Sequence, residues 1–217
     1  MTALGFLYPG HTAEDDYPRI EQLLGSDIRL DVVRTDPADP ERLAVTGEQL
    51  RLTGAEAVVR VGGAPAPDLR TAHEQVRALA LITGMPASST SFAFVHAAKE
   101  LGVTRLALAA TSGESETDAV TTFLGECGLE VTRVHAGAGD DLLALARDAD
   151  TPDAQAVLFP DPSLRTAAHL HSLEDALGKP VLTASQATVW EALRLTDRRV
   201  NAPKLGSLFT REPIVQV

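Results

Sequence analysis

Short apolar runs alternate with amphipathic stretches along the whole chain. Seven runs of strand length are apolar throughout or nearly so, at residues 4–8, 28–33, 57–61, 105–110, 129–134, 156–159 and 181–183. Helical spacing of apolar residues fills the intervals, at residues 15–24, 40–52, 68–82, 91–101, 116–127, 140–148, 163–177 and 186–195. Buried strands that alternate with helices are typical of parallel sheets covered by helices, so the pattern predicts an α/β fold.

An internal repeat divides this pattern into two similar parts. Residues 84–101 align with residues 178–195 without a gap, and the alignment pairs Ser91 with Ser185. In both copies a short strand leads into a serine-bearing turn and then a helix. We therefore expect two α/β halves with a small-molecule site in the cleft between them, beyond the carboxyl ends of the strands.

Composition and charge argue against two classes of binding partner, nucleic acids and membranes. The chain has 217 residues, of which 44% are hydrophobic and 23% charged, and its net charge is −11 without any cluster of Lys and Arg. A nucleic-acid partner is therefore not expected, because phosphate neutralisation needs a basic face. A membrane is not expected either, since every apolar run is far shorter than about 20 residues. A single cysteine and an N-terminus without a basic signal-peptide region predict a reducing, cytoplasmic location.

The first strand ends in a loop that offers one acid–base candidate. His11 follows Tyr8, Pro9 and Gly10, and an imidazole there is suited to proton transfer in the cleft. Thr12 with Asp15 three residues later also fits ordinary capping of the next helix. Both interpretations stay open for this loop.

Two further strand ends carry groups that could bind an anion. Gly62 and Gly63 allow backbone amides to converge on a substrate carboxylate, although these glycines fit a simple turn at least as well. Thr111 and Ser112 offer hydroxyls near a helix start, where the helix dipole favours anions. Ser115 with Asp118 also fits an ordinary capping box at that helix start.

Asp161 is the only carboxylate predicted at the end of a central strand. This position makes it the best acid–base candidate, although an Asp before Pro162 also fits a helix N-cap. Cys127 follows a predicted helix away from every strand end, so we expect it to be structural. His169 and His171 are two residues apart and do not share a helix face, so no metal site is predicted.

Residues 100–109 and the segment Ser185-Gln186-Ala187-Thr188 with its flanking residues resemble sequences of the maleate isomerase and arylmalonate decarboxylase branch of the Asp/Glu racemase superfamily. The resemblance runs from the first strand to Phe209, and its most specific segments are residues 100–109 and 180–190. The second segment, from Pro180 to Trp190, is similar to the family signature Ser-Asn-Gln-Ala-Thr. The resemblance implies two pseudo-symmetric Rossmann-like halves with four-stranded parallel sheets, and neither metal nor organic cofactor. We place the first half at residues 1–88, completed by 200–217, and the second at 89–199.

The resemblance also marks where this chain departs from its family. Isomerases and racemases of the branch use two strand-end cysteines, and these positions fall on Gly63 and Asp161. The decarboxylases keep only the second cysteine, which protonates an enediolate. A thiolate's nucleophilic role is not reproduced by a carboxylate, although a carboxylate can move protons. We therefore do not expect the cysteine mechanism of either family activity in this chain.

Other family positions that bind substrate are also changed. The hydroxyls that follow the first cysteine position become Ala64 and Pro65, and a decarboxylase tyrosine becomes Ser112. An amide donor is lost at Pro162, and the family asparagine of the first loop becomes Thr12. Because each donor that stabilises an enediolate is worth ~3 kcal/mol, these losses weaken the oxyanion hole.

Two functions remain after these comparisons of residues. The first is a cofactor-independent isomerase, decarboxylase or lyase for a small carboxylate, in which Asp161 moves protons and His11 assists. The second is a pseudoenzyme that binds a small carboxylate for sensing or regulation. A homo-oligomer is a possible assembly in either case. The expected substrate-binding residues are Thr12, Gly63, Ala64, Ser91, Thr111, Ser112, Ser185 and Gln186.

Overall fold

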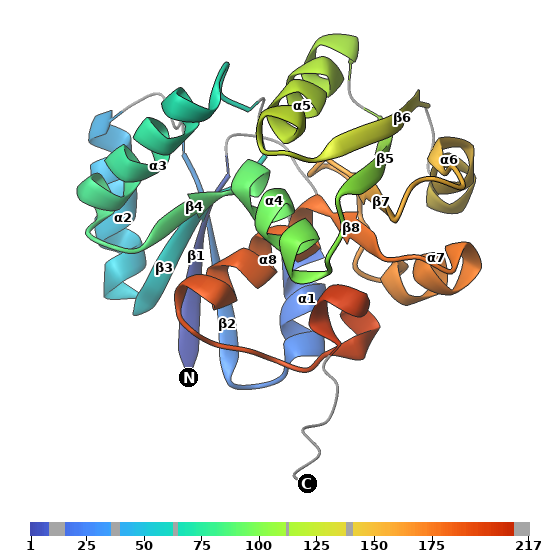
Figure 1. The fold of residues 1–217 in the computed structure, drawn as a ribbon. Helices are drawn as coiled ribbons and strands as arrows, with labels where there is room; N and C mark the ends of the chain where they lie inside the picture. The colour runs from blue at the N-terminus through green and yellow to red at the C-terminus, as the bar shows by residue number, and fades with distance from the viewer. Residues whose placement is uncertain (9–15, 36–39, 63–64, 112, 138–140, 211–217) are drawn as a thin grey trace, which may run out of the picture.

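In the part of the chain that the structure describes, eight parallel strands form two sheets with the same strand order. The computed structural model describes residues 1–8, 16–35, 40–62, 65–111, 113–137 and 141–210. The first sheet has the order β2-β1-β3-β4 and contains β1 (Thr2–Tyr8), β2 (Ile28–Arg34), β3 (Ala55–Arg60) and β4 (Ala87–Ser89). The second has the order β6-β5-β7-β8 and contains β5 (Arg105–Ala110), β6 (Glu130–Ala136), β7 (Ala156–Phe159) and β8 (Val181–Thr183). The predicted pair of four-stranded parallel sheets is confirmed (Figure 1).

The helices follow the strands in strict alternation over the described ranges. They are α1 (Asp16–Leu24), α2 (Pro40–Leu52), α3 (Leu69–Thr83), α4 (Thr90–Glu100), α5 (Glu114–Glu126), α6 (Leu142–Ala149), α7 (Leu170–Leu177) and α8 (Ala184–Leu195). Within these ranges, none of the helices combines the length and the apolar character that crossing a membrane requires.

The predicted internal repeat is confirmed by the positions of the strands and helices. Strand β4 and helix α4 recur as β8 and α8, shifted by the same 94 residues that relate Thr90 to Ala184. These two helices lie side by side in the centre of the molecule (Figure 1). Helix α8 also contacts β1, β3 and β4 of the first sheet. The division of the chain at residues 88 and 199 stays a prediction. In that division α8 belongs to the second half, although it contacts the sheet of the first half.

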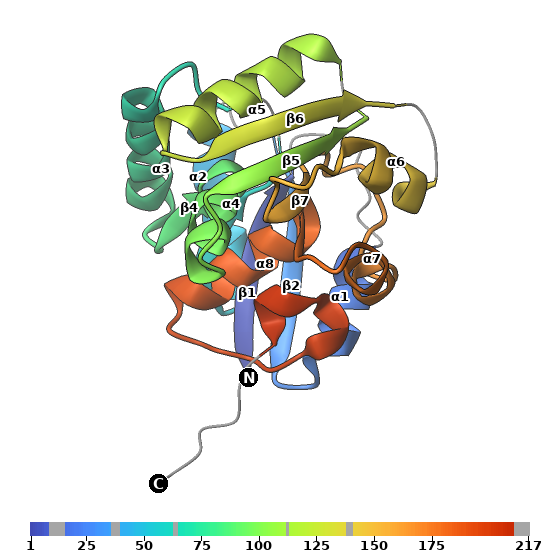
Figure 2. The ribbon, with the colours of Figure 1, turned by 45° about the vertical axis from the view of Figure 1, so that its right-hand side comes forward.

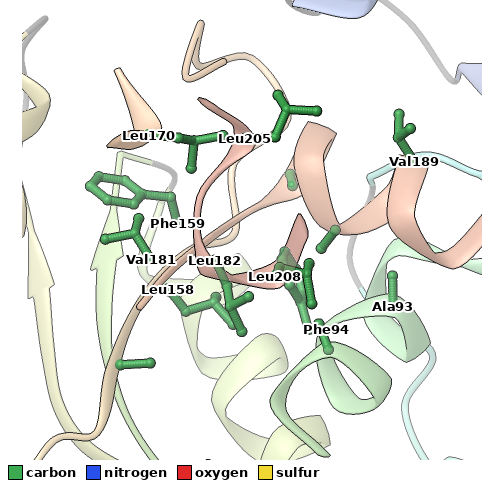
Figure 3. Packing of buried hydrophobic residues seen from close by; sticks show 14 of the residues in the cluster. Ala93, Phe94, Leu158, Phe159, Leu170, Val181, Leu182, Val189, Leu205 and Leu208 are labelled. Carbon is green, nitrogen blue, oxygen red and sulfur yellow. The ribbon is translucent and has the colours of Figure 1, made fainter. Parts of the chain in front are cut away.

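One apolar core extends through both halves and is closed by the C-terminal segment. The largest buried cluster contains side chains of both sheets, and two short 3-10 helices, η1 (Pro203–Leu205) and η2 (Ser207–Phe209), complete it. Leu205 and Leu208 of these turns lie among Phe94, Leu170 and Leu182 (Figure 3). The same segment lies beside α1 and α7 (Figure 2).

A buried charge cluster joins α4 to α8. The Glu191 side chain is fully buried and accepts hydrogen bonds from Ser88 Oγ at 2.7 Å and from Arg194 Nε at 2.7 Å. His96 Nδ1 lies 3.0 Å from its Oε1. Burial by itself raises the pKa of Glu191, but the bonds from Arg194, His96 and Ser88 outweigh it and lower the pKa from 4.5 to about 2. Glu191 is therefore a buried anion whose partners come from both halves.

Candidate functional site

The carboxyl ends of β5 and β7 bring Asp161 and Thr111 together. These strands are neighbours in the second sheet, and each residue lies just beyond its strand. Thr111 Oγ1 donates a hydrogen bond to Asp161 Oδ2, and Ser163 N donates to Oδ1 at 2.8 Å. Both carboxylate oxygens are therefore held, although the Asp161 side chain stays partly exposed. A fixed and solvent-reachable carboxylate at a strand end is suited to proton transfer.

The alternative interpretation of Asp161 as a helix N-cap is wrong. Helix α7 begins at Leu170 with His169 at its N-cap, so no helix starts after Pro162. Residues 161–169 instead form turns, and the expected helix at residues 163–177 is shorter by its first seven residues. The bond from Ser163 N to Asp161 is thus local to a turn, where a following proline and an Asp side chain are common.

The turn that carries Asp161 is attached to the first half of the molecule. Tyr8 Oη, at the end of β1, donates to the carbonyl oxygen of Pro162 at 3.3 Å. Gly62 lies directly against the ring of Pro162. A Cβ atom added to Gly62 would be only 2.6 Å from Pro162 Cγ. Gly62 also has φ +58°, a conformation that glycine adopts without strain. The strand ends of both halves therefore meet at Pro162.

A buried carboxylate that sequence reasoning missed fixes the far end of this turn. Asp16 is 4% exposed, at the start of α1, and its Oδ2 accepts from Thr166 N at 3.0 Å and from Ser185 Oγ at 2.7 Å. The amide of Ala167 donates to the same carboxylate at 3.2 Å. The Thr166 hydroxyl is a fourth donor group, 3.3 Å from Oδ2. These hydrogen bonds compensate the burial of the Asp16 carboxylate. Asp16 joins α1 of the first half to the segment that follows Asp161.

Aromatic side chains surround this joint between the halves. Tyr17 is 1% exposed and packs edge-on against Tyr8, with ring centroids 5.7 Å apart. Burial, followed by the neighbouring Tyr8 and Asp16, raises the pKa of Tyr17 well above its usual value. Tyr17 therefore stays neutral at physiological pH and acts as an apolar wall.

The N-termini of α4 and α8 meet at a pair of threonines. Thr90 Oγ1 and Thr188 Oγ1 are 2.7 Å apart, and Gly62 N donates to Thr90 Oγ1 at 3.0 Å. Ser91 lines a cavity of about 20 Å³ that also touches Gly62 and Pro160. This volume is enough for about one water molecule and not for a substrate. Within the described ranges, no three His, Cys, Asp or Glu side chains converge as metal ligands.

Comparison with known proteins identifies the family. The family model for arylmalonate decarboxylase matches residues 39–209, which is well over half of the chain. The chain belongs to this family.

Proteins with similar sequences include both a decarboxylase and an isomerase. Arylmalonate decarboxylase of Bordetella bronchiseptica is 31% identical over 142 residues, which are 58% of this chain and 59% of that protein. Maleate isomerase of Geobacillus stearothermophilus is 28% identical over 140 residues, 58% of this chain and 55% of the relative. The matched region therefore spans less than two thirds of either relative.

Solved structures of the family share the whole fold. A crystal structure of arylmalonate decarboxylase superposes with a TM-score of 0.76 at 24% identity, over 95% of this chain and 98% of that one. A mutant of Nocardia farcinica maleate cis-trans isomerase with a covalently bound succinylcysteine intermediate gives a TM-score of 0.81 at 18% identity, over 98% and 99%. At these identities the structures establish the fold alone.

The single thiol of this family member lies away from the strand ends. Cys127 is at the C-terminal end of α5, packed beside the small cluster of Phe92 and Phe123. Burial, with a smaller contribution from Glu126, raises the pKa of its thiol. A thiol with a raised pKa is a poor nucleophile, in agreement with the expected structural role.

The structure brings together only some of the expected site residues. Thr111 and Asp161 are in direct contact, and Ser91 lies at the N-terminus of α4 near Gly62. The other expectations at the strand ends, on His11, Thr12, Gly63, Ala64 and Ser112, lie outside the described residues. The capping box expected at Ser115 is not formed as predicted, because α5 begins at Glu114 with Gly113 at its N-cap.

Two expected substrate contacts are buried in the protein instead. Ser185 is 3% exposed and donates to Asp16, while Gln186 is fully buried. Gln186 Oε1 accepts from Thr183 N at 3.2 Å, and its Nε2 donates to Leu205 O at 2.7 Å. Both side chains therefore stabilise the fold through these hydrogen bonds and are not available to a substrate in this structure.

Proposed function

We propose that the protein is a cofactor-independent isomerase- or decarboxylase-like enzyme for a small carboxylate or dicarboxylate, in which Asp161 replaces the catalytic cysteine. Its family comprises decarboxylases and isomerases, which supports the coarse class. The observation that carries the finer proposal is the contact of Asp161 with Thr111 across neighbouring strand ends. A carboxylate fixed by a hydroxyl and a turn amide is prepared to accept or return a proton.

The chemistry best suited to these residues is proton transfer at a carbon next to a carboxylate. In a decarboxylation, the C–C bond breaks, carbon dioxide leaves, and the electron pair passes to the remaining carboxylate as an enediolate. A protonated Asp161 then gives its proton to that carbon and recovers one from solvent. The covalent succinylcysteine of the Nocardia farcinica isomerase mutant indicates that a thiolate adds to the substrate in that protein. This chain has Asp161 at the proposed catalytic position, and a carboxylate does not replace a thiolate in such an addition.

Other expected site residues have supporting roles in this proposal. His11 would exchange the proton with Asp161, and Ser91, Thr111 and Ser112 would bind the substrate carboxylate. Membership of the wider Asp/Glu racemase superfamily and a cytoplasmic location are part of the same proposal.

A pseudoenzyme that binds a small carboxylate is the second candidate. The observation that favours it is the contact of Pro162 with Gly62, which occupies the meeting point of the strand ends. Pro162 also has no N–H to donate to an enediolate, so the oxyanion hole is weaker there. Such a protein would bind the ligand and leave it unchanged.

A thermal-shift screen followed by a turnover assay separates the two candidates. Small mono- and dicarboxylates are screened against the wild type, and those that raise the Tm are incubated with it and followed by proton NMR. Phenylmalonate and maleate are included as the family's two substrate types. We expect product from at least one ligand, and loss of that product in Asp161→Asn but not in Asp153→Asn, which makes the same charge change at an exposed position. Stabilising ligands that all remain unchanged would favour the pseudoenzyme.

A further inference from the structure

A second cavity lies at the opposite end of α4 and α8 from Asp161. It has a volume of about 420 Å³, within the range of small-molecule sites. Its walls come from the C-terminal end of α4, the C-terminal half of α8 and the segment from Asp197 to Thr210. Helix α4 has 11 residues and spans roughly 16 Å, so this cavity is well separated from the strand ends near Thr90.

One wall of the cavity is apolar and fixed in place. Trp190 lines it from α8, and Leu208 and Phe209 line it from η2. Leu208 and Phe209 belong to the buried core, and Trp190 packs against that core. Ser207 N and its hydroxyl both bond to Glu174 Oε2, at 2.7 and 2.9 Å, which holds η2 in position. A rigid wall with an indole favours a flat apolar or aryl group.

Two guanidinium groups on the rim have no counter-ion among the residues that the structure describes. Arg198 and Arg199 are exposed and line the cavity, and neither forms an ion pair or side-chain hydrogen bond with any of the described residues. Their backbone is held where α8 ends, since Arg198 N bonds to Leu193 O at 2.9 Å. Asp197 has φ +53°, which is the left-handed turn common at a helix end. Two adjacent arginines without a partner in the described part of a chain of net charge −11 are suited to binding a carboxylate.

The remaining charges on the rim limit which anion can bind. Arg194 also lines the cavity but is already paired with the buried Glu191. Glu100 and Asp197 bring two carboxylates to the same rim. They offset the charge of Arg198 and Arg199, so a second negative charge on the ligand gains little, while a single carboxylate can still bond to the guanidinium groups.

We propose that this cavity is a second ligand site, which binds a small monocarboxylate with an apolar or aryl body. The carboxylate bonds to Arg198 and Arg199, and the body lies against Trp190 and Leu208. The site does not depend on whether Asp161 is catalytic.

The single tryptophan makes the site directly observable. Trp190 is the only Trp in the chain, so its indole N–H gives one resonance in a nitrogen–proton correlation spectrum. The wild-type protein is titrated with 3-phenylpropionate and hexanoate, and with 3-phenylpropanol, succinate and inorganic phosphate as comparisons. We expect a saturable shift of the Trp190 resonance with both monocarboxylates and a weaker response with the other three compounds.

Matched variants then test which groups bind the ligand. Arg198→Ala/Arg199→Ala should weaken binding of 3-phenylpropionate by about tenfold or more, because charge-assisted bonds are lost. Arg133→Ala/Arg147→Ala removes two exposed arginines from β6 and α6 and should leave it unchanged. Asp161→Asn should also leave the titration unchanged. Absence of a saturable shift, equal binding of the alcohol or of phosphate, equal loss in both double variants, or a dependence on Asp161 would each overturn the proposal.

Discussion

The buried anion between α4 and α8 gives a prediction with a defined pH dependence. Glu191 is fully buried, and Ser88, His96 and Arg194 all bond to its carboxylate. The substitution Glu191→Gln keeps the size of the side chain and removes its charge. It also turns an NH₂ group toward partners that are themselves donors. We therefore expect a lower free energy of unfolding, from the lost charge and not from a cavity.

The magnitude follows from the lowered pKa. The pKa of Glu191 is lowered from 4.5 to about 2, and at ~1.4 kcal/mol for each pKa unit this corresponds to about 3 kcal/mol. Because the folded-state pKa lies below the unfolded value, the contribution is complete above pH 4.5. It is lost progressively as the pH falls from 4.5 toward 2. Wild type should therefore exceed Glu191→Gln by about 3 kcal/mol at pH 7 and by clearly less at pH 3.

Urea unfolding of both proteins at pH 7 and pH 3 measures this difference. Titrating groups that do not contact Glu191 are shared by the two proteins, so their contributions cancel in the comparison. Glu48→Gln is the control, because Glu48 forms an exposed pair with Arg51 at 2.6 Å, and such pairs contribute about 1 kcal/mol or less. A Glu191→Gln deficit of the same size at both pH values would refute the reasoning, since the loss would then come from packing.

Three further substitutions test the joints around the site. Asp16→Asn should lower the free energy of unfolding in urea by about 2–4 kcal/mol, because its buried donors lose a charged acceptor; a change near zero would contradict this. Gly62→Ala should cost about 1–3 kcal/mol, and Pro162→Ala should restore part of it in a double-mutant cycle. Gln186→Leu should speed hydrogen exchange around Leu205, and unchanged exchange there would remove the role assigned to its 2.7 Å bond.

Periodicity and the internal repeat predicted two α/β halves, and the family resemblance added that each half has a four-stranded parallel sheet. Strand β8 was predicted with its observed bounds, and the 94-residue repeat correctly related α4 to α8. Strand β4 has only three residues and was absent from the predicted strands, although the repeat implied it. Apolar patterns detect such a short strand poorly, because two of its three residues are serines.

The details of the site depended on contacts between distant segments. Asp161 before Pro162 fits an N-cap locally, but the bond from Thr111, 50 residues away, and the late start of α7 at Leu170 decide otherwise. Asp16 lies in an acidic run at the start of α1, and no local signal distinguishes the carboxylate that turns inward. Its partners are about 150 residues away along the chain.

The role of Asp161 is tested most directly by deuterium incorporation. A carboxylate that stabilises the protein is incubated in deuterated water, and loss of the proton at its α-carbon is followed by proton NMR. We predict exchange by wild type and by Asp153→Asn, and a rate lower by about 100-fold or more in Asp161→Asn. Equal exchange in Asp161→Asn, or tight binding without exchange in the wild type, would contradict a proton-transferring carboxylate at the end of β7.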